Sequence, residues 1–294
     1  MDQAEHLRNI IKKQEIQPDR QTARVITVTS GKGGVGKTSV SVNLAINLSR
    51  MGKRVIILDA DFGLANIEIM LGIRPKYNLA DLMFRGKTIS DIITYGAENI
   101  GLISGGSGIN EMANLTREQV FHLIQKMTEL DRLADVIIVD TGAGIGDSVL
   151  EFVAASAEVL LVATPEPTSI TDAYALLKML NRSSSYHQGK TTVKLIANQV
   201  RGDNDADELF EKLGIVVNKF LNIDIEYLGA IPYDNNMLKA VIRQEPLSIA
   251  LPDSAAARAM RRIAAVLLDR GEEVPPRMGI MQLFSRVIKI KLRR

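Results

Sequence analysis

A glycine-rich stretch near the N-terminus carries the side chains best suited to phosphate chemistry. Its residues follow the spacing G-x-x-x-x-G-K-[ST] and end in Lys37 and Thr38. Glycines let backbone N–H groups turn toward phosphate oxygens, the lysine supplies a cation for the β- and γ-phosphates, and the threonine hydroxyl can bind Mg²⁺. A glycine-rich turn without a ligand is the alternative. The spacing predicts a nucleotide site built from Gly31, Lys32, Gly33, Gly34, Val35, Gly36, Lys37, Thr38 and Ser39.

Three aspartates lie directly after apolar, β-branched runs. Asp59 and Asp61 end one run, and Asp140 ends another. Carboxylates beside a phosphate loop can orient the ligands of Mg²⁺ and the water that attacks the nucleotide. The predicted metal ligands are Thr38, Asp59 and Asp140, the last acting through water. The alternatives are a polar strand end at Asp59 and Asp61 and a strand-end acid in a flexible turn at Asp140.

These side chains need a scaffold in which strand ends meet. The phosphate loop follows one apolar strand and opens a helix, which is the setting that such a loop requires. Continuous apolar strands that alternate with helices predict an α/β fold, in which a parallel sheet is covered on both faces and ligands bind at the carboxyl ends of the strands. The expected strands are 25–30, 54–61, 100–104, 135–140, 158–164, 193–199 and 227–231. The expected helices are 38–51, 117–131, 148–155, 169–180, 205–213 and 254–269.

Composition excludes several classes of protein. The chain has 294 residues, of which 46% are hydrophobic, and it contains no cysteine, so disulfides and cysteine-ligated iron–sulfur clusters are impossible. Its three histidines are scattered, which argues against a histidine-based metal site. We find neither the apolar segment of a signal peptide nor a run long enough to span a membrane, and we therefore expect a cytoplasmic protein.

The motifs together resemble one family. Gly31–Thr38 is similar to the deviant Walker A motif of the MinD/ParA family of P-loop ATPases, and Asp140-Thr141-Gly142 resembles its Walker B segment. The resemblance implies that Lys32 contacts the ATP of a partner subunit, that Asp61 is critical for hydrolysis and that ATP drives homodimerisation. The catalytic residues carried over in this way are Lys32, Lys37 and Asp61.

The predicted base pocket also rests on this resemblance. Asn198 is similar to the asparagine with which the family contacts the base, and an amide can bond the edge of adenine as donor and acceptor. Pro232, Tyr233 and Asp234 resemble the loop that closes over adenine. A structural role for Asn198 is the alternative. The chain lacks the guanine-type N-K-x-D pattern, so ATP with Mg²⁺ is the expected cofactor pair rather than GTP.

The C-terminal segment is basic and amphipathic. From Arg277 onward it holds six bases and no acid, although the whole chain has a formal net charge of only +2. Placed on a helix after a proline break, it predicts an interfacial anchor on an anionic membrane, bound reversibly. A terminal helix packed on its own domain is the alternative. The predicted membrane residues are Ile280, Leu283, Phe284, Val287, Ile288, Lys289 and Lys291.

The N-terminal segment resembles a second motif. Asp2, Gln3, Ala4, Leu7 and Arg8 match the D-Q-A-x-x-L-R pattern of the FlhG (YlxH, FleN) flagellar-number regulators within the MinD family. The resemblance implies a helix that activates FlhF, a signal-recognition-type GTPase, and contacts with basal-body (C-ring) proteins. A disordered or tag-like tail is the alternative.

The chain is thus divided into three parts. We expect an activator helix and linker over 1–21, an ATPase domain over 22–272 and a membrane-targeting helix over 273–294, located in the cytoplasm and reversibly on the inner face of the cell membrane. A MinD-type division regulator would lack the N-terminal motif. A ParA-type partition ATPase would need a basic patch for DNA on the body, which is mildly acidic without the tail, so DNA binding is not expected. The absence of cysteine argues against iron-protein reductases and iron–sulfur scaffolds.

Overall fold

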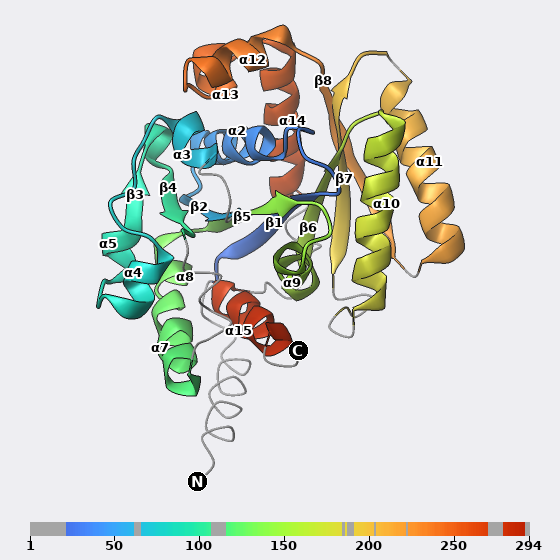
Figure 1. Ribbon diagram of the computed structural model, residues 1–294. Helices are drawn as coiled ribbons and strands as arrows, with labels where there is room; N and C mark the ends of the chain where they lie inside the picture. Colours follow the sequence, from blue (N-terminus) through green and yellow to red (C-terminus); the bar gives the residue numbers. More distant parts are fainter. Residues whose placement is uncertain are drawn as a thin grey trace.

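One sheet of eight strands runs through the part of the chain that the structure describes (Figure 1). The structure, a computed structural model, describes residues 22–61, 66–106, 116–183, 186, 191–202, 204–221, 223–269 and 279–291. The strands are arranged in the order β3-β4-β2-β5-β1-β6-β7-β8. Their bounds are β1 Arg24–Ser30, β2 Val55–Ala60, β3 Ile93–Tyr95, β4 Gly101–Ser104, β5 Val136–Ala143, β6 Glu158–Ala163, β7 Thr192–Val200 and β8 Ile225–Pro232.

The register of the central strands brings the predicted site residues to one edge of the sheet. Strand β5 pairs in parallel with both β1 and β2, so that Asp140 stands opposite Val28 on one side and Asp59 on the other. Because the carboxyl ends of parallel strands meet at the same edge, the phosphate loop after β1 lies beside these aspartates. The predicted fold class is confirmed, with one difference: β3 runs antiparallel to β4.

Helices cover both faces of the sheet (Figure 1). Along β1 the faces alternate, so that Ile26 packs in the core beneath α2 and α14 while Val25 packs in the core of the opposite face. The helices are α2 Lys37–Arg50, α3 Asn66–Leu71, α4 Leu79–Phe84, α5 Ile89–Ile92, the 3₁₀ helix η1 Ala97–Asn99, α7 Arg117–Met127, α8 Leu130–Leu133, α9 Asp147–Ala155, α10 Pro167–Arg182, α11 Asp205–Phe220, α12 Asn235–Ile242, α13 Leu247–Ala250, α14 Ala255–Asp269 and α15 Ile280–Lys291.

The C-terminal helix α15 is docked on its own domain. It packs beside α7 and α9, and the ring of Phe284 meets the ring of Phe152 edge to face with centroids 6.1 Å apart. Six large apolar side chains on this helix are buried, namely Ile280, Met281, Leu283, Phe284, Val287 and Ile288. This is the arrangement weighed above as the alternative to a membrane anchor. A lipid-bound helix would therefore have to leave this groove first.

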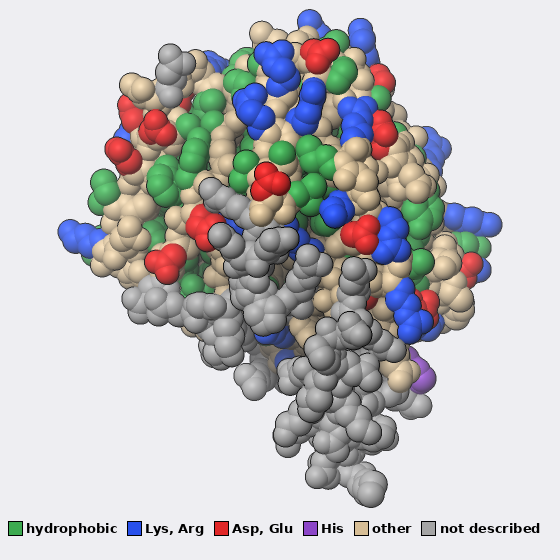
Figure 2. All heavy atoms as spheres, turned by 180° about the vertical axis from the view of Figure 1, so that it is seen from behind, with side chains coloured by type: hydrophobic (Ala, Val, Ile, Leu, Met, Phe, Trp, Pro, Cys, Tyr) green, Lys and Arg blue, Asp and Glu red, His purple; other side chains and the backbone are tan. Residues whose placement is uncertain are grey.

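Several elements differ from the sequence-based expectation. The predicted helix 117–131 is divided into α7 and α8, and α11 continues past Leu213 to Phe220. The edge strand β3 and the short helices α3, α4, α5, α12 and α13 were not predicted. None of the described helices is long and apolar enough to cross a membrane. On the face opposite to that of Figure 1, Lys and Arg side chains share the surface with Asp and Glu (Figure 2).

Candidate functional site

The phosphate loop joins β1 to the N-terminus of α2. Gly34 and Gly36 adopt φ values of 78° and 88°, a region that side chains other than glycine rarely enter. Gly36 is also the N-cap of α2, and no side chain caps this helix. The first N–H groups of a 14-residue helix therefore lack a side-chain acceptor, as an anion-binding helix terminus requires.

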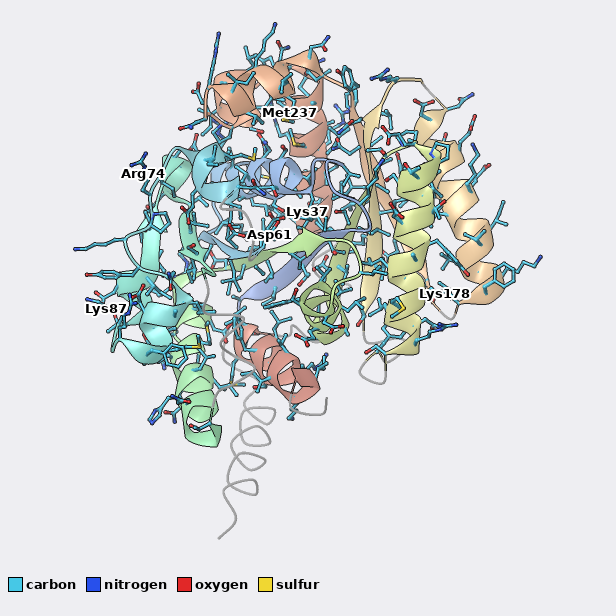
Figure 3. The ribbon with its side chains drawn as sticks, in the orientation of Figure 1. Lys37, Asp61, Arg74, Lys87, Lys178 and Met237 are labelled. Carbon is cyan, nitrogen blue, oxygen red and sulfur yellow. The ribbon has the colours of Figure 1, made fainter. Side chains whose placement is uncertain are left out.

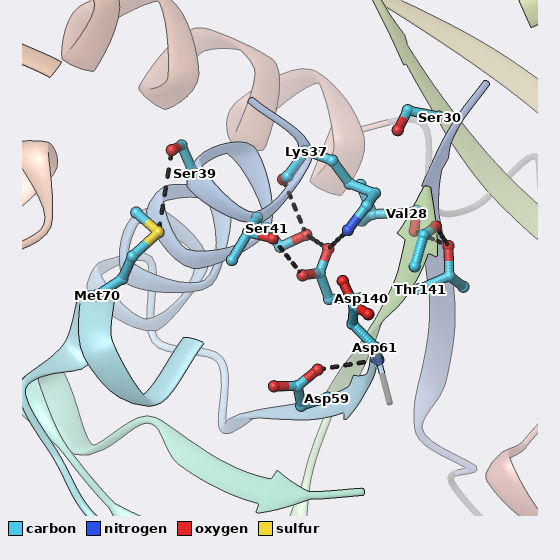
Figure 4. Close-up of polar contacts among 12 residues, drawn as sticks. Val28, Ser30, Lys37, Ser39, Ser41, Asp59, Asp61, Met70, Asp140 and Thr141 are labelled. Carbon is cyan, nitrogen blue, oxygen red and sulfur yellow. Dashed lines mark hydrogen bonds and ion pairs between the residues drawn. The ribbon is translucent and has the colours of Figure 1, made fainter. Parts of the chain in front are cut away.

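Asp140 gathers three side chains from the loop and from α2 (Figure 4). Its Oδ1 lies 3.2 Å from the Lys37 ammonium and accepts a hydrogen bond from the Ser41 hydroxyl at 2.8 Å, while its Oδ2 accepts from the Thr38 hydroxyl at 2.8 Å. Burial raises the pKa of Asp140, whereas Lys37 and the two hydroxyls lower it. The predicted Walker B acid and the predicted phosphate lysine and metal threonine thus form one cluster. Ser41 belongs to it as well and was not predicted.

The two aspartates at the end of β2 lie beside this cluster. Asp59 Oδ1 accepts a hydrogen bond from the backbone N–H of Asp61 at 3.0 Å. Burial raises the pKa of Asp59 to about 7, and the negative charges of Asp140 and Asp61 add to this effect. Lys37 and Asp61 lie close together above the ends of the central strands, whereas Arg74, Lys87 and Lys178 lie at the periphery (Figure 3). The site therefore concentrates carboxylates around one buried cation.

These residues fit a magnesium-bound nucleoside triphosphate. A Cβ added to Gly33 or to Gly34 would meet no atom within 4 Å, so space is open along the loop. The described residues hold no cluster of three or more His, Cys, Asp or Glu that could bind a metal by themselves. A hydroxyl and carboxylates that share a metal with phosphate oxygens and water are the usual magnesium site of this kind, and Thr38, Asp59 and Asp140 are the residues that would supply them.

Strand β7 supports the phosphate loop from outside. The Asn198 amide nitrogen donates to the carbonyl oxygen of Val35 at 2.7 Å, and a Cβ on Gly36 would collide with it. The Gln199 amide nitrogen donates to the carbonyl oxygen of Gly34 at 3.3 Å. In a trans peptide the C=O and the next N–H point in opposite directions. Carbonyls held toward β7 therefore direct the N–H groups of Val35 and Gly36 away from β7.

Gln199 is a site residue that sequence reasoning missed. It has φ = 60°, in the left-handed region, although it is not glycine. Such strain persists where the surrounding structure enforces it, and it often marks functional sites. No sequence signal identifies it apart from its position next to Asn198. The proposed contact of Asn198 with adenine stays a prediction, because its amide nitrogen is engaged with the loop.

The predicted adenine loop follows β8. Pro232 ends this strand, and the backbone N–H of Tyr233 donates to the carbonyl oxygen of Val200 at the end of β7. The Tyr233 residue is 46% exposed, and the Arg201 guanidinium lies 4.5 Å from the centre of its ring. Asp234 caps α12 by accepting from the N–H of Asn236 at 2.9 Å. The loop is therefore placed beside the phosphate loop by the pairing of β7 with β8.

Lys32 points away from the cluster of Lys37. Its ammonium lies 2.8 Å from a carboxylate oxygen of Glu166 and donates to the Thr168 hydroxyl at 2.8 Å. Both partners lie at the start of α10 in the same chain. Glu166 was not predicted as a partner, because it is separated from Lys32 by 134 residues.

The two predicted terminal sites differ in what the structure says of them. The N-terminal residues Asp2, Gln3, Ala4, Leu7 and Arg8 lie outside the described residues. In α15 the predicted apolar membrane residues are buried against the domain, whereas Lys289 is exposed. The side chain of Lys291 lies outside the described part.

Comparisons with known proteins point to one family. Residues 21–268 match the model of the family described as ParA, the NUBPL iron-transfer P-loop NTPases. The antiactivator FleN of Pseudomonas aeruginosa is 45% identical over 241 residues, which cover 82% of this chain and 85% of FleN. The flagellum site-determining protein YlxH of Helicobacter pylori is 31% identical over 299 residues, covering 97% and 96% of the two chains.

A solved structure gives the same picture. The MinD cell division protein of Aquifex aeolicus aligns with a TM-score of 0.67 and 25% identity, covering 87% of this chain and all of that chain.

Proposed function

The chain belongs to the ParA family of P-loop NTPases, and from this premise we propose that it is an ATP-driven switch that regulates flagellar number or placement. The observation that carries the ATPase part is the convergence of Lys37, Thr38 and Ser41 on the buried Asp140 beside an uncapped helix terminus. The flagellar part rests on the similarity to FleN and YlxH.

The proposed chemistry is hydrolysis of ATP to ADP and phosphate. The loop N–H groups and Lys37 would bind the β- and γ-phosphates, and Thr38, Asp59 and Asp140 would hold magnesium. Bound magnesium neutralises phosphate charge. Asp61 orients the attacking water, and Asn198 with the Pro232–Asp234 loop holds adenine.

We further propose that ATP joins two copies of the chain. The Lys32 side chain is separated from the Lys37 cluster and lies at the surface. It can therefore leave Glu166 and bind a phosphate of the ATP held by a second subunit. The resulting dimer would present two C-terminal helices. Two weak anchors on one particle bind a membrane more tightly than one, because the second contact is intramolecular.

The N-terminal segment is proposed to act on a different protein. Its match to the D-Q-A-x-x-L-R pattern supports an activator helix for an FlhF-type GTPase, with Gln3 placed at the GTP site of that partner and Leu7 as an apolar anchor. Basal-body proteins are proposed as further partners, and DNA is not.

The decisive experiment separates the two activities. Purified protein should hydrolyse ATP in the presence of Mg²⁺, and Lys37→Ala should abolish this turnover. A peptide of residues 1–20 should accelerate GTP hydrolysis by an FlhF-type GTPase, and the same peptide with Gln3→Ala should accelerate it less. Absence of ATP turnover would reject the proposed ATPase activity. A silent peptide together with normal ATP turnover would reject only the flagellar assignment.

A further inference from the structure

One carboxylate oxygen accepts hydrogen bonds from two backbone N–H groups, one before the first strand and one at the start of the last described helix. Asp131, in α8, uses its Oδ1 atom to accept a hydrogen bond from the backbone N–H of Ala23 at 3.3 Å and another from the backbone N–H of Ile280 at 3.4 Å. Ala23 is the residue directly before β1, and Ile280 is the first residue of α15. In Figure 1 the start of α15, the start of β1 and α8 lie near one another, as these contacts require.

The surroundings of Asp131 are closely packed. A Cβ added to Gly279 would lie 2.9 Å and 3.0 Å from the two carboxylate oxygens, so this position favours glycine. Ala23 is 1% exposed and belongs to the apolar cluster that also contains Ile280 and Phe284. Asp131 is partly buried, and this burial raises the pKa of its carboxyl to about 6.

The two hydrogen bonds depend on each other. Partial burial of a carboxylate costs free energy unless donors satisfy it, and here the backbone N–H groups of Ala23 and Ile280 supply two donors. If α15 leaves, Asp131 loses the N–H donor of Ile280, and more water competes for its oxygen. The hydrogen bond from Ala23 to Asp131 then becomes more exposed to solvent. By linkage, loss of the Ala23 contact weakens the docking of α15 to the same extent.

We propose that Asp131 couples α15 to Ala23, the residue directly before β1. Docking of α15 then holds the backbone at Ala23 in place, and undocking of α15 releases it. None of the residues that make these contacts belongs to the proposed ATP site. One consequence rests on the proposed function: the membrane-bound form would be the form whose N-terminal helix is free to reach a partner GTPase.

The first experiment measures hydrogen exchange at the Ala23 amide. The Ala23 amide lies outside the sheet ladder, because the ladder contact begins with Arg24, so its hydrogen exchange reports the bond to Asp131. Phe284→Glu, which places a charge against Phe152, should undock α15 and raise the exchange rate of this amide about tenfold, the effect of losing one hydrogen bond to a charged group. Gly279→Val should do the same by displacing Asp131. Lys289→Ala, an exposed change on α15, is the control and should leave the rate unchanged.

The second experiment reads the coupling in the opposite direction. Because the chain contains no cysteine, Lys289→Cys accepts a single spin label that reports the docking of α15. Asp131→Ala should increase the mobility of this label. The matched control is Asp135→Ala, which removes a nearby carboxylate that pairs with Arg54. Asp131→Asn retains an oxygen acceptor and carries no charge, so it should leave the label as immobile as in wild-type protein.

Two results would overturn the proposal. One is an unchanged exchange rate at Ala23 in both undocking variants while the label at position 289 shows that α15 is mobile. The other is a label that is equally immobile in wild-type protein and in Asp131→Ala. Neither measurement uses nucleotide, lipid or a GTPase, so failure here would leave the proposed function standing, and failure of that function would leave the coupling standing.

Discussion

Lys32 and Glu166 form an ion pair within one chain, with 2.8 Å between the ammonium nitrogen and a carboxylate oxygen. The Thr168 hydroxyl accepts a second hydrogen bond from the same ammonium. A lysine that is to reach the nucleotide of a second subunit must first leave both partners. The monomer therefore holds its proposed dimerising residue in place, and the strength of this hold affects how readily a dimer forms.

Glu166→Gln should favour the ATP-dependent dimer. The change removes the charge that retains Lys32, and because the pair is largely exposed the gain should be modest, roughly two- to fivefold in the dimer dissociation constant. Light scattering across a concentration series with Mg²⁺ and ATP measures it. Glu208→Gln, which breaks a comparable exposed pair with Lys212, is the control. An equal shift in the control, or none in Glu166→Gln, would show that Glu166 does not restrain Lys32.

Asp61→Ala should separate binding of ATP from its hydrolysis. The carboxylate is proposed to orient water rather than to bind phosphate, so we expect ATP affinity to stay near the wild-type value and turnover to fall about 10²-fold. Calorimetry and a phosphate-release assay measure the two quantities. Lys37→Ala should instead lose binding itself. If Asp61→Ala binds ATP as poorly as Lys37→Ala, Asp61 belongs to the binding machinery.

Gln199→Ala should weaken ATP binding without changing the chemical step. The lost contact is a single hydrogen bond to Gly34, so the dissociation constant should rise roughly three- to tenfold with kcat unchanged. Gln199→Gly removes the same side chain but adopts φ = 60° without strain. It should therefore show the same affinity loss and a higher melting temperature than Gln199→Ala. A fall in kcat with unaltered affinity in both variants would contradict a positioning role.

Asp131→Asn should change the pH dependence of stability. Burial raises the pKa of the Asp131 carboxyl from 3.8 to about 6, so its contribution favours folding fully below about pH 4 and is lost as pH rises through 6. The asparagine does not ionise, so the variant should gain stability relative to wild type between pH 4 and pH 7.5, by at most about 3 kcal/mol. Urea unfolding at both pH values measures this difference.

Asp135→Asn provides the opposite control for that experiment. Arg54 lowers the pKa of Asp135, so this carboxylate stabilises the fold at neutral pH and loses that effect as pH falls. Asp135→Asn should therefore lose stability relative to wild type as pH rises. If the two variants show the same trend, the burial of Asp131 does not control its titration.

The C-terminal helix should bind anionic vesicles in a way that depends on nucleotide. With ATP more protein should sediment with the vesicles than with ADP, and a chain truncated after Arg277 should stay in the supernatant. Lys289→Glu reverses one exposed charge and should weaken binding about tenfold or more, since each base near an anionic surface contributes about 1 kcal/mol. Neutral vesicles are the control. Equal sedimentation of the full and truncated chains would refute the anchor.

The central strands and the phosphate loop could be predicted because their signals are local. Continuous β-branched runs mark β1, β2 and β5, and the loop carries its own spacing. Strand β3 has three residues and pairs antiparallel at the edge of the sheet, so it leaves no periodic pattern. The start of α4, by contrast, has a readable capping box in Asn78 and Asp81 that was overlooked.

The partners of site residues could not be predicted, because they come from distant parts of the chain. Glu166 meets Lys32 only after the sheet has formed, and Gln199 takes a left-handed backbone that its residue type does not indicate. The tail shows a different limit. An apolar helix face with charged flanks gives the same sequence pattern whether it contacts lipid or the protein core. In the structure, the apolar face of α15 packs on α7 and α9.

The docked position of α15 also has a consequence for synthesis of the protein. This helix is synthesised after all the other described elements, yet it supplies Phe284 and its apolar neighbours to the core that includes α9. Until α15 has been synthesised, the growing chain must carry an uncovered apolar surface on that side, and such surfaces promote aggregation. A transcript cut short before α15, or a ribosome stalled there, would therefore yield a chain with an intact ATP-site sequence that nevertheless depends on chaperones to stay soluble.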